Sequence, residues 1–214
     1  MARYFSRDTA DKLAGFVDGK IQNIQKRYIA KPGGDSWSRA CLARLRRDFD
    51  GATPSWMTVG SDLFAGWPDD VPLVDDSVRE VAAVKAAMEL YAWHQQSQPQ
   101  GMAQESGAGK DRMTFGKACS GLARDPSRAK AIRRRLEAIE ACPDFNGMVR
   151  GIRALIMMMR RPGGDVKPIE LDYRALTRDL YQMQFPESRS AVFQRWSRDY
   201  WNSISPDTDK TKRQ

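Results

Sequence analysis

Residues 125–161, DPSRAKAIRRRLEAIEACPDFNGMVRGIRALIMMMRR, contain two helical patterns in succession and decide the fold class. Apolar residues recur every three or four positions in both halves of this stretch, which is the spacing of one face of an α-helix. Asp125 and Pro126 supply a helix cap and a proline for the first helical position, while Pro143 and Asp144 end the first helix and cap the second. The stretch therefore predicts two consecutive amphipathic helices.

The same period of about 3.6 residues dominates the rest of the chain, and the alternation typical of β-strands is almost absent. Ser77 and Glu80 have the spacing of a capping box and predict a helix that continues to about Gln96. The helical pattern weakens in residues 51–74, for which we expect a loop region. Its apolar anchors are Trp56, Phe64 and Trp67. The predicted fold class is all-α, with two small helical bundles joined by a flexible linker.

Gly, Ser and Gln are frequent in residues 98–112, and a segment of this composition buries too little apolar surface to fold alone. We therefore predict an N-terminal helical bundle over residues 1–97, a flexible loop or linker over 98–112 and a C-terminal helical bundle over 113–204. The polar residues 205–214 are expected to form a disordered tail. Within the first bundle, Trp37 is expected to face the core.

The excess of positive charge is concentrated in one region. The chain has 35 Lys and Arg against 27 Asp and Glu, and residues 110–161 alone contain thirteen basic and five acidic residues. Lys and Arg that neutralise phosphates release condensed counterions, so a local excess of this kind favours a polyanionic partner. A basic surface without a partner explains the same excess, and charge alone leaves both interpretations open.

Groups suited to catalysis are scarce. The single histidine, His94, is interpreted as a packing or hydrogen-bonding residue, and no GxSxG, HExxH, P-loop or CxxC motif occurs. The acidic pairs at 69–70 and 75–76 are explained more simply by helix capping than by a metal-dependent nuclease. We therefore expect a protein that is not an enzyme and that needs neither a cofactor nor a metal ion.

The cysteines indicate a reducing compartment. Cys41, Cys119 and Cys142 stand far apart and are odd in number, which is typical neither of a disulfide framework nor of a zinc site. The N-terminal segment lacks the apolar stretch of a signal peptide, and no apolar run approaches the length of a membrane span. We expect a soluble, cytoplasmic protein.

Basic residues on the two helices of residues 125–161 lie apart from the apolar face when they are placed at 100° per residue. The predicted phosphate-binding residues of the first helix are Lys130, Arg133, Arg134 and Arg135, and those of the second are Arg150 and Arg153. Arginine suits bidentate contact with phosphate oxygens. An ordinary solvated face usually mixes charges of both signs, whereas few carboxylates accompany these residues. No zinc finger, RNP aromatic pair or helix-turn-helix is evident, so we expect sequence-independent backbone binding.

Seven short motifs occur along the chain in a characteristic order. They are LARLRR (42–47), YAWHQQS (91–97), TFGKACSGLA (114–123), RRRLEAIEA (133–141), MVRGIRALI (148–156), LDYRALTRDL (171–180) and FQRWSRDYW (193–201). In this order and spacing the motifs resemble the CasB family, the small subunit of the type I-E CRISPR Cascade complex. Each motif alone is weak, but the series covers nearly the whole chain.

The resemblance implies a non-catalytic α-helical protein that stabilises the R-loop formed when guide RNA pairs with target DNA. The implied partners are the backbone and large subunits of Cascade, a second copy of the chain placed head to tail, the guide RNA, and the target and displaced DNA strands. Residues that match basic positions of the family motifs are Arg46, Arg47, Arg79, Lys117, Arg134 and Arg153. The alternatives are a free-standing helical DNA- or RNA-binding protein, a metal-dependent nuclease, and a helical scaffold without nucleic acid.

Overall fold

The computed structural model describes residues 4–49, 56–74, 77–105, 109, 112–161 and 167–204. Within these residues every regular element is an α-helix, so the predicted all-α fold class is confirmed. The only extended pairing among them is an isolated bridge between Ala103 and Leu171. None of the helices in this part of the chain is both long and apolar enough to span a membrane.

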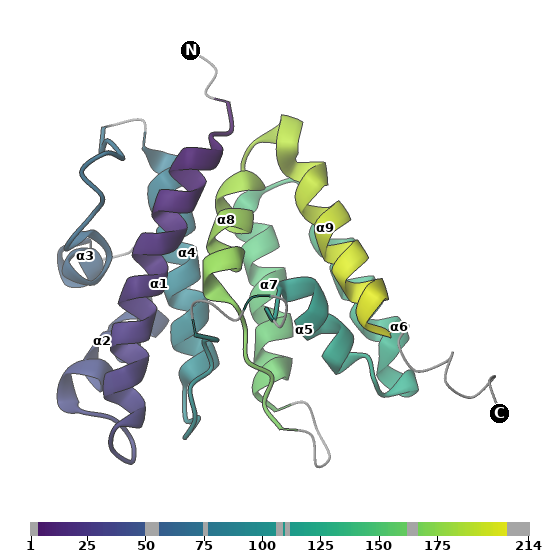
Figure 1. Ribbon diagram of the computed structural model, residues 1–214, viewed down its shortest axis with the longest axis horizontal. Helices are drawn as coiled ribbons and strands as arrows, with labels where there is room; N and C mark the ends of the chain where they lie inside the picture. The colour runs from purple at the N-terminus through teal and green to yellow at the C-terminus, as the bar shows by residue number, and fades with distance from the viewer. Residues whose placement is uncertain are drawn as a thin grey trace.

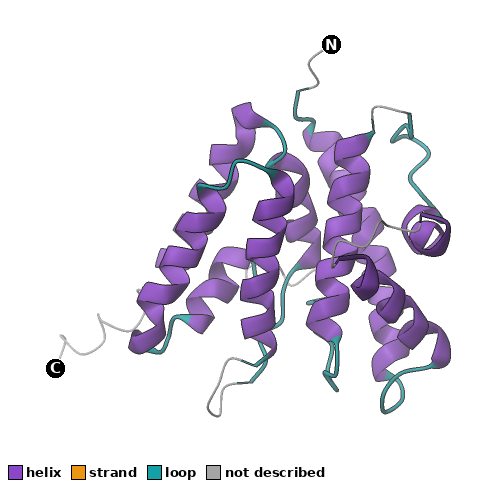
Figure 2. Cartoon of the chain, turned by 180° about the vertical axis from the view of Figure 1, so that it is seen from behind, coloured by secondary structure: helices purple, strands orange, loops and turns teal. Residues whose placement is uncertain are grey.

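The helices form two groups that lie side by side in Figure 1, and Figure 2 shows the same arrangement from behind. The first group consists of α1 (Arg7–Ile29), α2 (Ser36–Phe49), α3 (Trp56–Phe64) and α4 (Val78–Gln95). The second consists of α5 (Phe115–Leu122), α6 (Pro126–Glu140), α7 (Phe145–Arg160), α8 (Tyr173–Gln182) and α9 (Pro186–Ile204).

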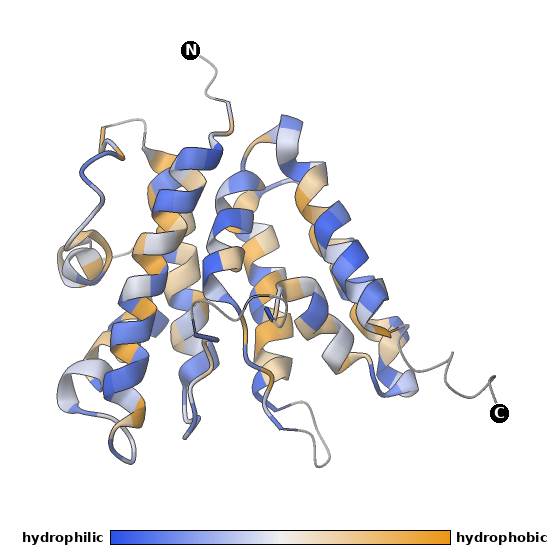
Figure 3. Ribbon diagram, in the orientation of Figure 1, coloured by the Kyte–Doolittle hydropathy of each residue, from blue (hydrophilic) through white to orange (hydrophobic). Residues whose placement is uncertain are grey.

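A shared hydrophobic core joins the two groups. Helices α1 and α4 pack against α8, and α4 also packs against α7. One cluster of buried side chains contains Leu13 and Tyr91 from the first group together with Ile152 and Leu180 from the second. Figure 3 shows the apolar residues on the inward sides of these helices. The division of the chain into two bundles stays a prediction, because the buried surface is continuous across the boundary.

Two glutamines hold the first part of the predicted linker. The Gln25 amide donates to the carbonyl of Ala103 and accepts from its backbone N–H, both at 2.8 Å. The Gln95 side chain donates to the carbonyl of Gln100 at 2.8 Å and accepts from Met102 N at 3.0 Å. These bonds fix residues 98–105 more firmly than their composition predicts. Residues 106–108, 110 and 111, like the predicted tail at 205–214, lie outside the described residues.

Local capping explains why α6 and α7 begin where the sequence predicts. The Asp125 carboxylate accepts from Ser127 N at 2.9 Å, with Pro126 at the first helical position. The Asp144 carboxylate accepts from Gly147 N at 2.7 Å. Each cap satisfies a backbone N–H that has no partner within its helix.

The start of α4 was predicted for the wrong reason. The helix does begin at Val78, but Ser77 makes no side-chain cap bond to it. Instead, the Ser77 hydroxyl donates to the carbonyl of Pro72 at 2.7 Å, and the Glu80 carboxylate accepts from the Tyr181 hydroxyl at 3.0 Å. Tertiary contacts with the preceding loop and with α8 therefore replace the predicted capping box.

The prediction of a loop over residues 51–74 was wrong in its middle, which forms helix α3. Val59 and Leu63 lie four residues apart on its buried side. Two of the three expected anchors are present, because the Trp67 ring centroid lies 5.5 Å from that of Phe16 and 5.9 Å from that of Phe64. The third, Trp56, is 46% exposed. A helix of nine residues contains too few turns for its periodicity to stand out in the sequence.

Trp37 does not face the core, contrary to the prediction. Its residue surface is 39% exposed, and the Arg27 guanidinium lies 4.4 Å from the ring centroid. Cys41 and Leu45, one and two turns further along α2, are fully buried. The first turn of α2 thus lies at the rim of the core, where a charged side chain from α1 covers the indole.

Candidate nucleic-acid interface

His94 is a hydrogen-bonding core residue, as predicted. It is fully buried, and its Nδ1 lies 3.0 Å from the Tyr173 hydroxyl. Burial lowers the pKa of His94 to about 3, so the ring is neutral at physiological pH. Among the described residues no three His, Cys, Asp or Glu come together to hold a metal ion. Asp70 pairs with Lys12 at 2.7 Å, while residues 75 and 76 lie outside the described part.

Three arginines converge on the last turns of α4. Arg46 of α2 donates to the carbonyl of Ala92 at 3.4 Å. Arg160 of α7 donates to the carbonyl of Gln96 at 2.5 Å. Because the last carbonyls of a helix lack intrahelical partners and carry the negative end of its dipole, they attract such cations.

The third of these arginines is Arg153, which lies on α7 like Arg160. Its guanidinium lies 3.9 Å from the centroid of the Trp93 ring, within the range of a cation–π contact. Arg153 and Arg160 are seven residues apart, which places them on the same side of α7, about 10 Å from each other along its axis. We call Arg46, Arg153 and Arg160 the α4-end cluster.

Two members of the α4-end cluster are held without a carboxylate among the described residues. Arg46 donates to a main-chain oxygen, and Arg160 donates to the backbone and side chain of Gln96 and contacts a methionine sulfur. Burial lowers the pKa of Arg46. Burial, and then the positive charges of Arg161 and Arg46, lower the pKa of Arg160. Arg46 is half-buried and Arg160 is 8% exposed, so two cations lie close together beneath the surface at the end of α4.

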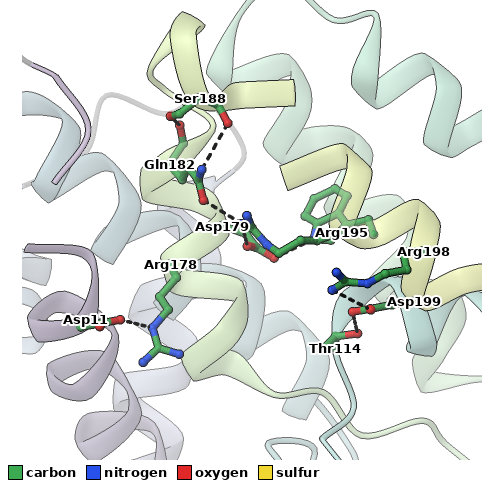
Figure 4. Close-up of polar contacts among 10 residues, drawn as sticks. Asp11, Thr114, Arg178, Asp179, Gln182, Ser188, Arg195, Arg198 and Asp199 are labelled. Carbon is green, nitrogen blue, oxygen red and sulfur yellow. Dashed lines mark hydrogen bonds and ion pairs between the residues drawn. The ribbon is translucent and has the colours of Figure 1, made fainter. Parts of the chain in front are cut away.

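Three arginines of α8 and α9 are arranged differently, because carboxylates pair with them (Figure 4). The pairs are Arg178 with Asp11, Arg195 with Asp179 at 2.7 Å, and Arg198 with Asp199 at 3.5 Å. Asp179 also accepts from the indole N–H of Trp196 at 2.6 Å. The first pair links α8 to α1 and the second links α9 to α8, and all three leave less charge for a partner.

The predicted basic face of α6 is present on the surface. Lys130, Arg134 and Arg135 are exposed and, together with Ser127, line a shallow depression. We call Lys130, Arg134 and Arg135 the α6 patch. Arg133 differs from them, because it is half-buried and its guanidinium lies 5.8 Å from the centroid of the Trp201 ring on α9.

Arg150 belongs to neither of these two groups. It is exposed on α7, one turn before Arg153. Helices α6 and α7 pack together and are joined by the short segment 141–144, so they run in opposite directions. Arg134 and Arg150 lie six or seven residues from that segment, which places both at about the same level along the helix pair.

Three residues predicted from the family motifs lie in other environments. Arg47 is exposed beside Arg46 in the last turn of α2. The Arg79 guanidinium lies 4.6 Å from the Phe185 ring centroid, and Arg79 is about 20 Å along α4 from Ala92. Lys117 is half-buried on α5, which packs against α9. The structure does not bring Arg79 together with the α4-end cluster.

Two residues of the interface were absent from the predicted site. The sequence places Arg160 in the same basic sector of its helix as Arg150 and Arg153, although Arg160 was not among the predicted phosphate-binding residues. Trp93 had no such signal, because its contact with Arg153 depends on how α4 packs against α7. Only the tertiary structure identifies it as a support for an arginine.

Comparison with known proteins gives consistent matches. The model of the family described as CRISPR-associated protein Cse2 matches residues 41–201. CasB from Thermobifida fusca is 26% identical with a TM-score of 0.69, covering 88% of this chain and 97% of that chain. CasB from M. ruber is 19% identical with a TM-score of 0.54, covering 86% and 94%.

A chain of a structure described as a CRISPR RNA-guided surveillance complex is 17% identical with a TM-score of 0.59. This match covers 94% of the present chain and 99% of the other. Comparison with curated protein sequences finds no significant match. At such low identity the surveillance-complex match and the M. ruber match demonstrate a common fold.

Proposed function

Because this chain belongs to the family of CRISPR-associated protein Cse2, we propose that it is a small subunit of a type I-E Cascade surveillance complex in the cytoplasm. In this role it has no catalytic activity and assembles with the backbone and large subunits and with a second copy of itself. Its nucleic-acid partners are the guide RNA and the target and displaced DNA strands. The likeness to CasB from Thermobifida fusca over almost the full length of both chains supports this proposal.

The observation that carries the nucleic-acid part is the way in which Arg46 and Arg160 are held. Main-chain and amide oxygens fix both guanidinium groups while their charge is left without a carboxylate among the described residues. A phosphate diester supplies the missing negative charge and matches the fork of donors on arginine. The α6 patch and Arg150 add exposed cations on α6 and α7, two helices that pack together.

Backbone contacts of this kind fit the stabilisation of an R-loop. The guide–target duplex is about as stable as the DNA duplex that it replaces, so modest protein contacts shift the balance. The guide supplies the sequence information, and the protein contacts must therefore tolerate every sequence. Arginines aimed at phosphates meet this requirement because phosphates carry no sequence information directly.

A salt titration of DNA binding tests the proposal. The variant Lys130→Ala/Arg134→Ala/Arg135→Ala removes the α6 patch. We expect the slope of log K against log salt to fall by about 0.7–0.9 for each lost phosphate contact. The matched control, Lys26→Ala/Lys31→Ala/Arg39→Ala, removes three exposed basic residues from the first group of helices and should leave the slope unchanged.

Three outcomes would count against the proposal. Equal slopes for both triple variants mean that the patch does not contact phosphates. Absence of binding to any oligonucleotide at low salt favours a protein-binding scaffold. Cleavage of labelled DNA when Mg²⁺ or Mn²⁺ is added to the purified chain supports the nuclease alternative. Co-assembly with the other Cascade subunits, with tighter DNA binding than by the isolated chain, supports the proposed role over a free-standing binding protein.

A further inference from the structure

A small groove separates α6 from α9 on the side of Arg133. Its volume is about 140 Å³. The α6 side consists of Arg133, Leu136, Glu137 and Glu140, and the α9 side of Phe193, Trp196, Ser197, Tyr200 and Trp201. Most of the lining is therefore aromatic or aliphatic. Arg133 belongs to this lining, while Arg134, the next residue, belongs to the α6 patch.

The orientation of the aromatic rings suits a flat ligand. Trp201 is 49% exposed, and the edge contact with Tyr200, at 5.2 Å between centroids and 86° between planes, sets its orientation. The Arg133 guanidinium lies on the Trp201 ring at 5.8 Å from its centroid. An exposed indole with a cationic neighbour is the type of platform on which nucleic-acid bases stack.

Polar groups also line the groove. Tyr200 is 2% exposed, and its hydroxyl faces the Arg133 guanidinium. Glu137 and Glu140 are exposed on α6, and no ion pair engages either carboxylate among the described residues. An exocyclic amino group of a base is a suitable donor to such a carboxylate.

We propose that the α6–α9 groove binds one unstacked nucleobase of a single strand whose phosphates lie on the α6 patch. The base stacks on Trp201 and directs an exocyclic amino group toward Glu137 or Glu140, which favours cytosine, adenine or guanine over thymine, the one base without such a group. This inference rests on the proposed nucleic-acid binding and adds a preference for single strands. A duplex keeps its bases stacked and paired, so its bases do not reach the groove.

Charge placement favours a nucleotide over other occupants. The cations of the α6 patch lie on the surface outside the groove, and the carboxylates of Glu137 and Glu140 lie at the groove itself, one and two turns along α6 from Arg133. A nucleotide has the matching arrangement, with an anionic backbone and a neutral base that carries N–H donors. A negatively charged peptide would meet Glu137 and Glu140, and such a contact between like charges is unfavourable.

Trp201 provides a direct test on the full chain. Binding is measured with labelled 15-mers of deoxycytidine and deoxythymidine and with a duplex of the same length. For Trp201→Ala we expect single-strand affinity to fall roughly ten- to hundredfold, because a stacked base contributes about 1–3 kcal/mol. Duplex affinity and the salt slope should stay unchanged. Trp201→Phe keeps an aromatic ring and should restore most of the single-strand affinity, and it confirms that the fold is retained.

Glu137→Gln/Glu140→Gln tests the choice of base. It should reduce the preference for deoxycytidine over deoxythymidine at unchanged salt slope. Equal losses on single strand and duplex in Trp201→Ala, or no loss on either, would overturn the groove proposal. So would a Trp201→Ala variant that retains DNA binding but loses self-association in sedimentation, because a second copy would then occupy the groove. If the proposed nucleic-acid binding itself is wrong, the wild-type chain binds none of the three probes, which distinguishes that outcome from failure of the groove proposal alone.

Discussion

Arg153 on α7 covers Trp93 on α4, with its guanidinium 3.9 Å from the ring centroid. The contact joins the two groups of helices and also fixes a cation at the surface that we propose for phosphate binding. Because the side chain is already ordered, less conformational entropy is lost when an anion binds. Arg150, one turn earlier, is exposed, and none of the contacts described above holds it.

Replacing these two arginines should separate binding from stability. Arg153→Ala is expected to lower the free energy of unfolding by about 1 kcal/mol, from loss of the cation–π contact, and to reduce the salt slope of DNA binding by about one unit. Arg150→Ala should reduce the slope by a similar amount without changing stability. Chemical denaturation and salt titration measure the two effects. A stability loss in Arg150→Ala equal to that in Arg153→Ala would contradict this assignment.

His94 should make the stability of the chain depend on pH. Its pKa falls from an ordinary value of 6.5 to about 3 through burial, so below pH 6.5 the unfolded chain binds a proton that the folded chain does not. The stability contributed by neutral His94 is present above pH 6.5 and declines as the pH falls toward 3. At pH 5 the loss is about 2 kcal/mol.

The variant His94→Gln isolates this contribution, since glutamine does not titrate. At pH 7.5 the variant should be less stable than the wild type, and the gap should narrow by about 2 kcal/mol at pH 5. Urea denaturation at several pH values measures the gap. A gap that stays constant from pH 7.5 to 5 would show that His94 keeps an ordinary pKa.

Removal of the buried carboxylate of Asp179 is expected to destabilise the fold more than removal of an exposed one. Asp179 accepts from Arg195 at 2.7 Å and from Trp196 Nε1 at 2.6 Å, and burial raises its pKa. Asp179→Ala leaves both donors without their acceptor and should lower the free energy of unfolding by about 3 kcal/mol. As a control, Asp8→Ala breaks an exposed pair with Lys12 and should have little effect. Similar losses in both variants would contradict a special role for Asp179.

Gly116 allows the close approach of α5 to α9. A Cβ atom at this position would lie 2.3 Å from the carbonyl oxygen of Trp196, and a backbone atom moves aside only when its helix moves. Gly116→Ala should therefore destabilise the fold by about 1–3 kcal/mol. Gly15→Ala in α1, where no atom lies within 4 Å of the added Cβ, should instead stabilise it by about 0.5–1 kcal/mol. Thermal melting of both variants checks the opposite signs.

The sequence predicts most of this fold because most helix ends here are local. Asp125 and Asp144 bind backbone N–H groups two and three residues ahead of them, so a short window of sequence contains the whole interaction. Helix α3 was not predicted, because a helix of nine residues shows little periodicity in the sequence. The Ser77 cap was misassigned because its hydroxyl binds a carbonyl of the preceding loop, which competes with the capping box.

The candidate site was predictable only where one helix supplies it. The α6 patch follows from the phase of Lys130 and Arg134, four residues apart on one surface. The α4-end cluster needs three helices to converge, and the periodicity of each helix separately does not contain that information. The two internal arginines Arg178 and Arg195 make the same point, because only the structure shows which carboxylates neutralise them.

The packing of α1 against α8 has a consequence for synthesis on the ribosome. Roughly 140 residues separate the end of α1 from the start of α8. At a translation rate of about 5–20 residues per second, the ribosome needs roughly 7 to 30 s to synthesise the residues between α1 and α8. During that interval Leu13, Val17 and Ile21 lack part of the surface that later buries them. Nascent chains that stop before α8 are therefore expected to depend on chaperones.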